Sequence, residues 1–190
     1  MAPCLNVQCN ALWRINKGPK WAREKMILLG LGANLPHPAY GPPRETLEAA
    51  LAAIEAAGAI VARRSPWFRT PPWPPSDQPW YVNGVAQLET DLKPGSLMTL
   101  LHGVEREFGR TRGRRNEARV LDLDLLAYGE RISAPGEQPE LPHPRLADRG
   151  FVLLPLASIA PDWRHPVSGE TLAVLIERLP ASERQVEALD

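Results

Sequence analysis

The stretch "RVLDLDLLAYG" (residues 119–129) alternates three leucines with two aspartates: Leu121, Asp122, Leu123, Asp124 and Leu125. Strict alternation of this kind predicts a strand with one buried face. Aspartate is depleted in strands, and two carboxylates two positions apart lie on the same face, about 6.5–7 Å from each other. Because like charges at that distance repel, either the pair belongs to a solvated polar face or it binds something positive.

A group of arginines comes just before this strand: Arg110, Arg112, Arg114, Arg115 and Arg119. Carboxylates beside arginines suit a site for magnesium and phosphate, because Mg²⁺ takes one or two carboxylates and shares phosphate oxygens that arginine forks also bind. The alternative is a solvated basic loop. The sequence has no G-x-x-x-x-G-K-[ST] loop, and "GLGANL" (30–35) lacks the third glycine of a dinucleotide motif.

Aromatic residues flank the proline-rich loop "PPWPPSDQP" (71–79): Trp67, Phe68, Trp73, Trp80 and Tyr81. We expect Trp67 and Phe68 to pack in the core because they lie in a predicted strand. The other three border the loop, where they could face a flat ligand. Asn83 falls on the same strand face as Tyr81 and can donate and accept at the edge of a heterocycle.

The hydrophobic pattern predicts strand, helix, strand, strand, helix, strand, which is the split βαβ, ferredoxin-like plan. The first strand is predicted at 26–32 and the second at 59–70, where Pro66 interrupts it. The remaining elements of this plan are a helix at 44–58, a strand at 81–90, a helix from 94 to about 108 and the strand that carries the aspartates. A further strand at 151–156 and a short helix at 171–179 follow the "LPHP" loop.

Composition narrows the class of protein. The chain has 190 residues, 44% of them hydrophobic, and a formal net charge of zero, which argues against binding nucleic acid or membrane by bulk charge. Its two cysteines both lie in the first ten residues, so a disulfide framework is excluded and a reducing cytosol fits. No apolar run approaches the roughly 20 residues that span a bilayer. We interpret residues 1–25 as an extension, either disordered or loosely attached, or as an over-long start with Met26 as the true first residue.

Four segments in register resemble one enzyme family: "RTPPWPPSDQPWYVN" (69–83), "VEREFGRTR" (104–112), "ARVLDLDLLAYG" (118–129) and "LPHPRLADRGFVLLPLASIAPDW" (141–163). The family is 6-hydroxymethyl-7,8-dihydropterin pyrophosphokinase, of the folate pathway, and the resemblance runs from about Met26 to near the C-terminus. It implies a ferredoxin-like, three-layer α/β/α domain over residues 26–190. It also implies transfer of the β,γ-pyrophosphoryl group of ATP to the pterin hydroxymethyl group, with release of AMP.

The resemblance implies a role for individual residues at the phosphate end of the site. Asp122 and Asp124 match the aspartates that bind two Mg²⁺ ions, and together with Arg110 and Arg119 they are the residues expected to be catalytic. The positions that match the family's ATP-binding residues are Glu105, Arg110, Arg112, Arg119, His143 and Arg149.

At the pterin end, Tyr81 and Phe151 match the aromatic residues on the two faces of the ring, and Asn83 matches the residue at its edge. Asp122 also belongs to this set. The loop that lines the pocket matches Thr70, Pro71, Pro72 and Trp73. Departures from the family pattern occur at His102, Asn116, Glu117 and Pro144 and concern loop closure and adenine contacts.

Two other functions share parts of this pattern. A palm-like, Mg²⁺-dependent nucleotidyltransferase also places aspartates on a ferredoxin-like sheet, but it does not explain the loop of prolines and aromatic residues. An RNA-recognition module shares the order of elements but requires an aromatic strand motif that "YVNGVAQLET" (81–90) lacks. We therefore expect a cytoplasmic, monomeric enzyme whose partners are ATP and the pterin, without nucleic acid or membrane.

Overall fold

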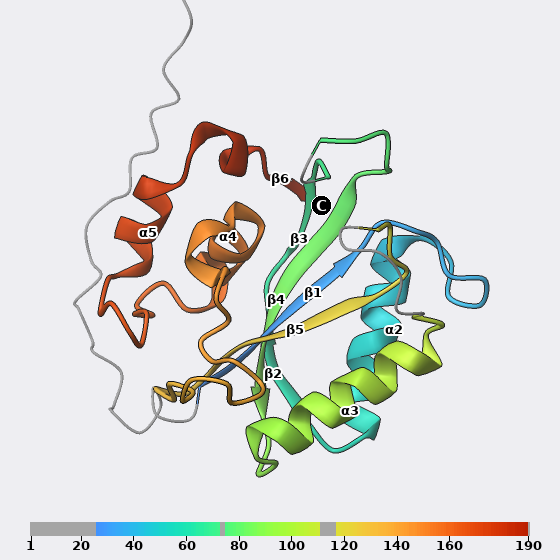
Figure 1. The fold of residues 1–190 in the computed structure, drawn as a ribbon. Coiled ribbons are helices and arrows are strands. Elements are labelled where there is room, and N and C mark those ends of the chain that lie inside the picture. Colours follow the sequence, from blue (N-terminus) through green and yellow to red (C-terminus); the bar gives the residue numbers. More distant parts are fainter. Residues whose placement is uncertain (1–25, 73–74, 111–116, 190) are drawn as a thin grey trace, which may run out of the picture.

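A sheet of six antiparallel strands forms the centre of the protein in the computed structural model, which describes residues 26–72, 75–110 and 117–189 (Figure 1). The strand order is β5-β1-β4-β3-β6, and β2 also pairs with β4. The strands are β1 (Ile27–Ala33), β2 (Ile60–Arg64), β3 (Trp67–Thr70), β4 (Tyr81–Glu89), β5 (Asp122–Tyr128) and β6 (Glu187–Leu189).

Helices cover both faces of this sheet (Figure 1). Helices α2 (Pro43–Ala56) and α3 (Pro94–Glu107) pack on one face, and α4 (Gly150–Ile159) and α5 (Leu172–Arg178) pack on the other. Short 3₁₀ helices lie at Leu146–Asp148 and Ala181–Arg184. The antiparallel sheet with a helical layer on each face confirms the predicted ferredoxin-like, three-layer α/β/α architecture. No helix in the described part of the chain has the length and apolar character needed to span a bilayer.

The predicted second strand is divided where Pro66 was expected to interrupt it. Strands β2 and β3 both pair with β4, and Ser65 between them donates its N–H to Val85 O and accepts the Val85 N–H at its hydroxyl. Trp67 is buried in the core, as predicted. Phe68 is half-buried and lies outside both apolar cores, so the prediction of core packing is wrong for this residue.

One predicted strand is a helix. Residues 151–156 form most of α4 rather than a strand, with Pro155 inside the helix. The run is apolar at nearly every position, and periodicity alone does not distinguish a buried strand from a buried helix in such a run. The strand β6 was not predicted; it pairs with β3 after the chain has passed around α4 and α5.

Strand β5 lies at the edge of the sheet, and its side chains alternate between the two helical layers. Leu123 and Leu125 belong to the apolar core under α2 and α3. A bulge in the pairing with β1 places Leu126 as an extra residue, and Leu126 joins the second core under α4 and α5. The aspartates of β5 therefore face the side of the sheet that carries α4.

Candidate active site

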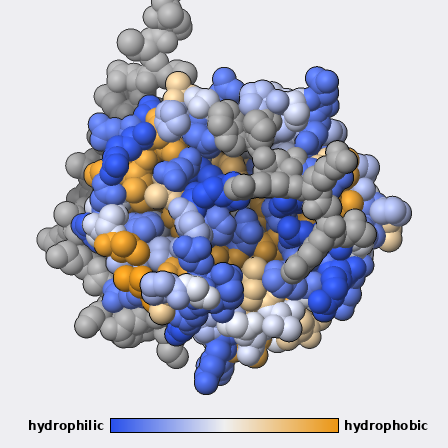
Figure 2. All heavy atoms as spheres, in the orientation of Figure 1, coloured by the Kyte–Doolittle hydropathy of each residue, from blue (hydrophilic) through white to orange (hydrophobic). Residues whose placement is uncertain are grey.

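A pocket opens on the α4 side of the sheet, over the middle strands. Its floor is formed by β1, β4 and β5, and its walls come from the segment after β3 and from the loop that leads into α4. Figure 2 shows hydrophilic residues gathered across this part of the surface. The lining includes Gly30, Gly32, Thr70, Pro71, Tyr81, Asn83, Arg119, Asp122, Asp124, Leu126, His143, Arg145, Arg149, Phe151 and Val152.

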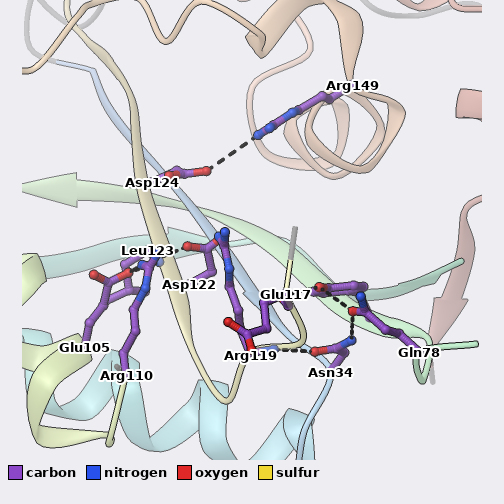
Figure 3. A network of polar contacts seen from close by, with 11 residues as sticks. Asn34, Gln78, Glu105, Arg110, Glu117, Arg119, Asp122, Leu123, Asp124 and Arg149 are labelled. Carbon is purple, nitrogen blue, oxygen red and sulfur yellow. Dashed lines mark hydrogen bonds and ion pairs between the residues drawn. The ribbon is translucent and has the colours of Figure 1, made fainter. Parts of the chain in front are cut away.

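Arginines surround the two aspartates of β5 (Figure 3). The Asp122 Oδ2 atom lies 2.5 Å from Arg119 Nη1, and its Oδ1 atom lies 2.8 Å from Arg110 Nη1. Arg149, at the start of α4, points down at Asp124 with its Nη1 3.6 Å from Oδ2. The predicted proximity of carboxylates and arginines is therefore present, with each aspartate facing at least one guanidinium.

The Asp122 carboxylate has one oxygen that fits a bound cation. Its Oδ1 atom is buried, and the nearby Arg110 nitrogen is not aligned as a hydrogen-bond donor, so the oxygen has no hydrogen-bond partner among the described residues. No group of three or more His, Cys, Asp or Glu side chains in this part of the chain could hold a metal by itself. Two carboxylates fit Mg²⁺ better than Zn²⁺, because Mg²⁺ uses few protein ligands and completes its shell with water and phosphate.

Glu105 supports this end of the pocket from behind. The residue lies near the end of α3, is 3% exposed, and does not line the pocket. Its Oε1 atom accepts the backbone N–H of Leu123 at 2.8 Å and also pairs with the Arg110 guanidinium. A single buried carboxylate therefore fixes both the strand between the two aspartates and one of the arginines that faces them (Figure 3).

His143 lies beside β5, where its backbone N–H donates to Leu126 O at 2.8 Å, whereas Arg149 faces Asp124 from the start of α4. Burial lowers the pKa of His143, and the guanidinium groups of Arg149 and Arg145 lower it further against the opposing effect of Asp124. Its Nδ1 atom accepts the Arg145 N–H at 3.1 Å, which agrees with a neutral ring. Burial also lowers the pKa of Arg149, although Asp124 favours its charged form.

The other end of the pocket combines aromatic side chains with a buried amide. Asn83 donates from Nδ2 to Thr70 Oγ1 at 2.7 Å, and its Oδ1 atom faces β1 so closely that a Cβ on Gly32 would lie 2.8 Å from it. Burial raises the pKa of Tyr81, whose hydroxyl lies 3.4 Å from both Gln78 Oε1 and the backbone oxygen of Glu117.

Phe151 is held by the start of helix α4. The Arg149 guanidinium lies 5.2 Å from the centroid of its ring. Gly150 between them donates its N–H to Glu183 Oε2 at 3.1 Å, and a Cβ on Gly150 would lie 1.6 Å from the Glu183 backbone oxygen. A segment near the C-terminus therefore packs directly on the backbone that carries both Arg149 and Phe151, and only glycine permits that approach.

Most of the predicted site residues meet in this pocket. Ten of them line it: Thr70, Pro71, Tyr81, Asn83, Arg119, Asp122, Asp124, His143, Arg149 and Phe151. Arg110 and Glu105 lie next to the aspartates without lining the pocket, and Pro72 is buried. Trp73 and Arg112 lie outside the described residues. Trp80, which could have faced a flat ligand, is instead 4.7 Å from the Arg69 guanidinium and does not line the pocket.

The sequence analysis missed two polar residues of this region. Arg145 lines the pocket beside His143, and its only signal was its place next to the "LPHP" segment. Asn34 follows β1 with its side chain buried, and hydrogen-bonds to two segments that flank the pocket. Its partners are more than forty positions away in the sequence, so no local pattern could have identified it.

Comparisons with known proteins agree with this arrangement. A sequence model of the family described as 7,8-dihydro-6-hydroxymethylpterin-pyrophosphokinase (HPPK) matches residues 28–161. Curated proteins named 2-amino-4-hydroxy-6-hydroxymethyldihydropteridine pyrophosphokinase are also similar. The protein from Synechocystis sp. is 43% identical over 80% of this chain and 75% of its own length. The one from Pseudomonas aeruginosa is 41% identical over 82% of this chain and 98% of its own.

Solved structures share the fold at low sequence identity. Plasmodium falciparum HPPK-DHPS in its wild-type form superposes with a TM-score of 0.61 at 14% identity, covering 80% of this chain and 40% of that chain. The triple mutant with pteroate gives a TM-score of 0.61 at 13% identity, covering 82% of this chain and 42% of that one. This chain therefore spans less than half of those proteins, and the likeness concerns the fold.

Proposed function

The chain belongs to the 7,8-dihydro-6-hydroxymethylpterin-pyrophosphokinase family, and from this premise we infer that it transfers the pyrophosphoryl group of ATP to 6-hydroxymethyl-7,8-dihydropterin in folate biosynthesis. The match over residues 28–161 leaves no support for a palm-like nucleotidyltransferase or an RNA-recognition module. In this reaction the hydroxymethyl oxygen forms a bond to the β-phosphorus of ATP. The bond from that phosphorus to the oxygen bridging to the α-phosphate breaks, AMP leaves, and the hydroxyl loses its proton.

One observation supports the placement of this reaction in the pocket: a carboxylate pair among arginines at one end and aromatic side chains with a buried amide at the other. A triphosphate needs the first environment, because its negative charge is offset by cations. A pterin needs the second, because a flat polar ring needs apolar faces and hydrogen bonds at its edge. We assign Tyr81, Phe151 and Asn83 to the pterin, together with the loop 70–73 and Asp122.

At the charged end we propose that Asp122 and Asp124 hold two Mg²⁺ ions, a role supported by the place of both carboxylates in the pocket lining and by the buried Asp122 Oδ1 atom, which accepts no hydrogen bond from the described residues. Bound Mg²⁺ would neutralise charge that develops on the phosphates during transfer. In the structure Arg110 and Arg119 are paired with Asp122. We propose that both arginines exchange this carboxylate for phosphate oxygens when ATP binds, and thereby release Asp122 for the metal.

The nucleotide would be held by further polar residues around this end. Arg149 faces Asp124 from the start of α4 and His143 lines the pocket beside β5, so both are available to the phosphates and the ribose. Glu105 and Arg112 complete the proposed ATP site, with Glu105 holding strand β5 and Arg110 in position. Orientation of the two substrates is the main contribution expected from the chain, because it converts an encounter in solution into a reaction between adjacent groups.

The test is formation of AMP from ATP with and without 6-hydroxymethyl-7,8-dihydropterin, at saturating Mg²⁺ and after its removal with a chelator. We expect AMP only when pterin and Mg²⁺ are both present. AMP formed at the same rate without the pterin would contradict the assigned acceptor. The variant Asp124→Asn serves as the control for a contaminating activity, because it should retain the fold and lose turnover.

We further propose that residues 26–190 suffice for this activity, and that the enzyme acts as a monomer in the cytoplasm without nucleic acid or membrane. The formal net charge of zero supports the absence of a polyanionic partner. Light scattering after size exclusion and an activity assay of a chain that begins at Met26 test these proposals.

A further inference from the structure

The buried amide of Asn34 joins two segments that flank the pocket. Asn34 directly follows β1, and only 2% of the residue is exposed to solvent. It does not line the pocket, so it makes no direct contact with a ligand there. A polar side chain at this depth is costly unless its hydrogen-bonding groups are all satisfied.

Each polar atom of this side chain has a partner. Its Oδ1 atom accepts the Arg119 N–H at 2.7 Å, and its Nδ2 atom donates to Gln78 Oε1 and Pro79 O, both at 3.2 Å. The orientation of the amide follows from these partners, because a backbone N–H only donates and a proline carbonyl only accepts. The backbone adds two bonds, since the N–H groups of Asn34 and Leu35 both donate to Arg119 O, at 2.9 and 3.1 Å.

The two partner segments carry different parts of the proposed site, and Figure 3 shows Asn34 between Arg119 and Gln78. On one side, the Arg119 guanidinium pairs with Asp122. On the other side, Gln78 lies 3.4 Å from the Tyr81 hydroxyl, which also reaches the backbone oxygen of Glu117, two residues before Arg119. The Asn34 amide therefore links the backbone of Arg119 to the loop that leads into Tyr81.

We propose that Asn34 is a positioning residue that couples pterin binding to ATP binding, which rests on the function proposed above. A pterin against Tyr81 and a triphosphate at Arg119 each order one of the two segments that share the Asn34 amide. The second ligand then binds to a partly ordered site. Coupling of this kind is reciprocal, so each ligand raises the affinity for the other by the same factor.

Two variants of Asn34 separate its contacts. Asn34→Ala removes all three side-chain hydrogen bonds. Asn34→Asp has nearly the same shape and keeps the acceptor for the Arg119 N–H, but it cannot donate to Pro79 O, so it serves if Asn34→Ala fails to fold. The matched control is Thr46→Val in α2, another buried polar side chain, whose hydroxyl bonds only to the Gly41 and Pro42 carbonyls and which does not line the pocket.

The measurement is the pterin dissociation constant with and without a saturating, non-hydrolysable ATP analogue and Mg²⁺, by calorimetry. In the wild-type protein we expect the analogue to tighten pterin binding. The ratio of the two constants should fall about fivefold or more in Asn34→Ala, the lower limit of couplings usually measured between sites. Asn34→Asp should lie between the two, and Thr46→Val should keep the wild-type ratio even if its melting temperature falls.

Two results would overturn the coupling while leaving the proposed function intact: a wild-type ratio of one with active enzyme, or a ratio that Asn34→Ala leaves unchanged. A wild-type chain that binds neither ligand and forms no AMP would overturn the proposed function and the coupling with it. A purely structural role for Asn34 would lower the melting temperature and weaken pterin binding equally with and without the ATP analogue, so the ratio of the two pterin dissociation constants would not change.

Discussion

The two faces of the sheet use the same strands for different purposes. On the face under α2 and α3, Leu123 and Leu125 join a continuous apolar core. On the other face, Asp122 and Asp124 from the same strand line the pocket. Because side chains alternate along a strand, adjacent residues of β5 face the apolar core and the pocket in turn. Substitutions at neighbouring positions of β5 should therefore affect different properties, activity at the aspartates and stability at the leucines.

Strand β1 shows the same division by a different means. Leu29 and Leu31 fill the core under α2 and α3, whereas Gly30 and Gly32 form part of the pocket floor. The space for a ligand on the α4 side therefore arises partly from absent side chains. Beyond the floor, Leu28 and Leu126 close that face under α4 and α5 as a second apolar core.

The largest expected effect separates the two faces on β5. Asp122→Asn should lower kcat on the order of a thousandfold, because metal-assisted charge stabilisation supplies several kcal/mol and each 1.4 kcal/mol changes a rate about tenfold. Leu123→Ala should instead lower the unfolding free energy by about 2–5 kcal/mol. Kinetics and urea denaturation of both variants measure the contrast. Near-normal turnover in a folded Asp122→Asn protein would remove the metal assignment.

The next effect concerns α4, where one helix contributes to both pocket and core. Phe151→Ala should weaken pterin binding about tenfold, because it removes a ring proposed to stack on the pterin, with a smaller change in melting temperature. Leu153→Ala, fully buried two residues later, should mainly lower stability. Pterin titration and thermal melts of both variants test this. If Phe151→Ala instead lowers stability and weakens ATP and pterin equally, Phe151 is a core residue.

A smaller effect is expected on the pocket floor. Gly32→Ala introduces a Cβ 2.8 Å from Asn83 Oδ1, so the amide must move, and pterin affinity should fall several-fold. Gly30→Ala is the matched control, because its Cβ meets only the flexible end of Leu126 at 3.3 Å. Titration of wild type and both variants with pterin decides the matter; a Gly32→Ala affinity equal to that of wild type would mean that Asn83 does not require its present position.

The smallest effect is a pH dependence that the polar lining introduces. Burial lowers the pKa of His143 in the folded protein below its usual 6.5. Between the folded pKa and 6.5, the unfolded chain therefore binds more protons than the folded one. Stability from this group is therefore complete above pH 6.5 and is lost as pH falls through the folded pKa. Denaturation of wild type and His143→Gln between pH 5 and 8 should show a shallower slope for the variant. His165, whose pKa is also lowered by burial, is common to both proteins and cancels.

The sequence predicted those elements in which the period of hydrophobic residues matches the face that is buried in the structure. The alternation in β5 and the helical stripes of α2 and α3 are of this kind, and so is the interruption at Pro66. Residues 151–156 were misassigned because α4 is apolar on every side, so its pattern has no period. The three residues of β6 form a strand only through their pairing with β3, which no local pattern indicates.

The same reasoning applies to the site. Aspartates, arginines and aromatic residues were identified because their types and spacing indicate chemistry. Asn34 was not, because its hydrogen bonds to Gln78 and Arg119 join segments that only the fold brings near. Gly150 and Glu183 meet for the same reason, by the return of the chain past α4.

The hydrogen bond of Glu105 to strand β5 also affects how readily another molecule can add to the sheet. Strand β5 is an edge strand, and an edge with free N–H groups is a template on which another chain can add a strand. The Glu105 carboxylate occupies the Leu123 N–H from the open side of that edge. A charged side chain that satisfies the edge in this way opposes strand addition and aggregation. The carboxylate that holds β5 beside the proposed metal site thus also covers one N–H of the edge strand.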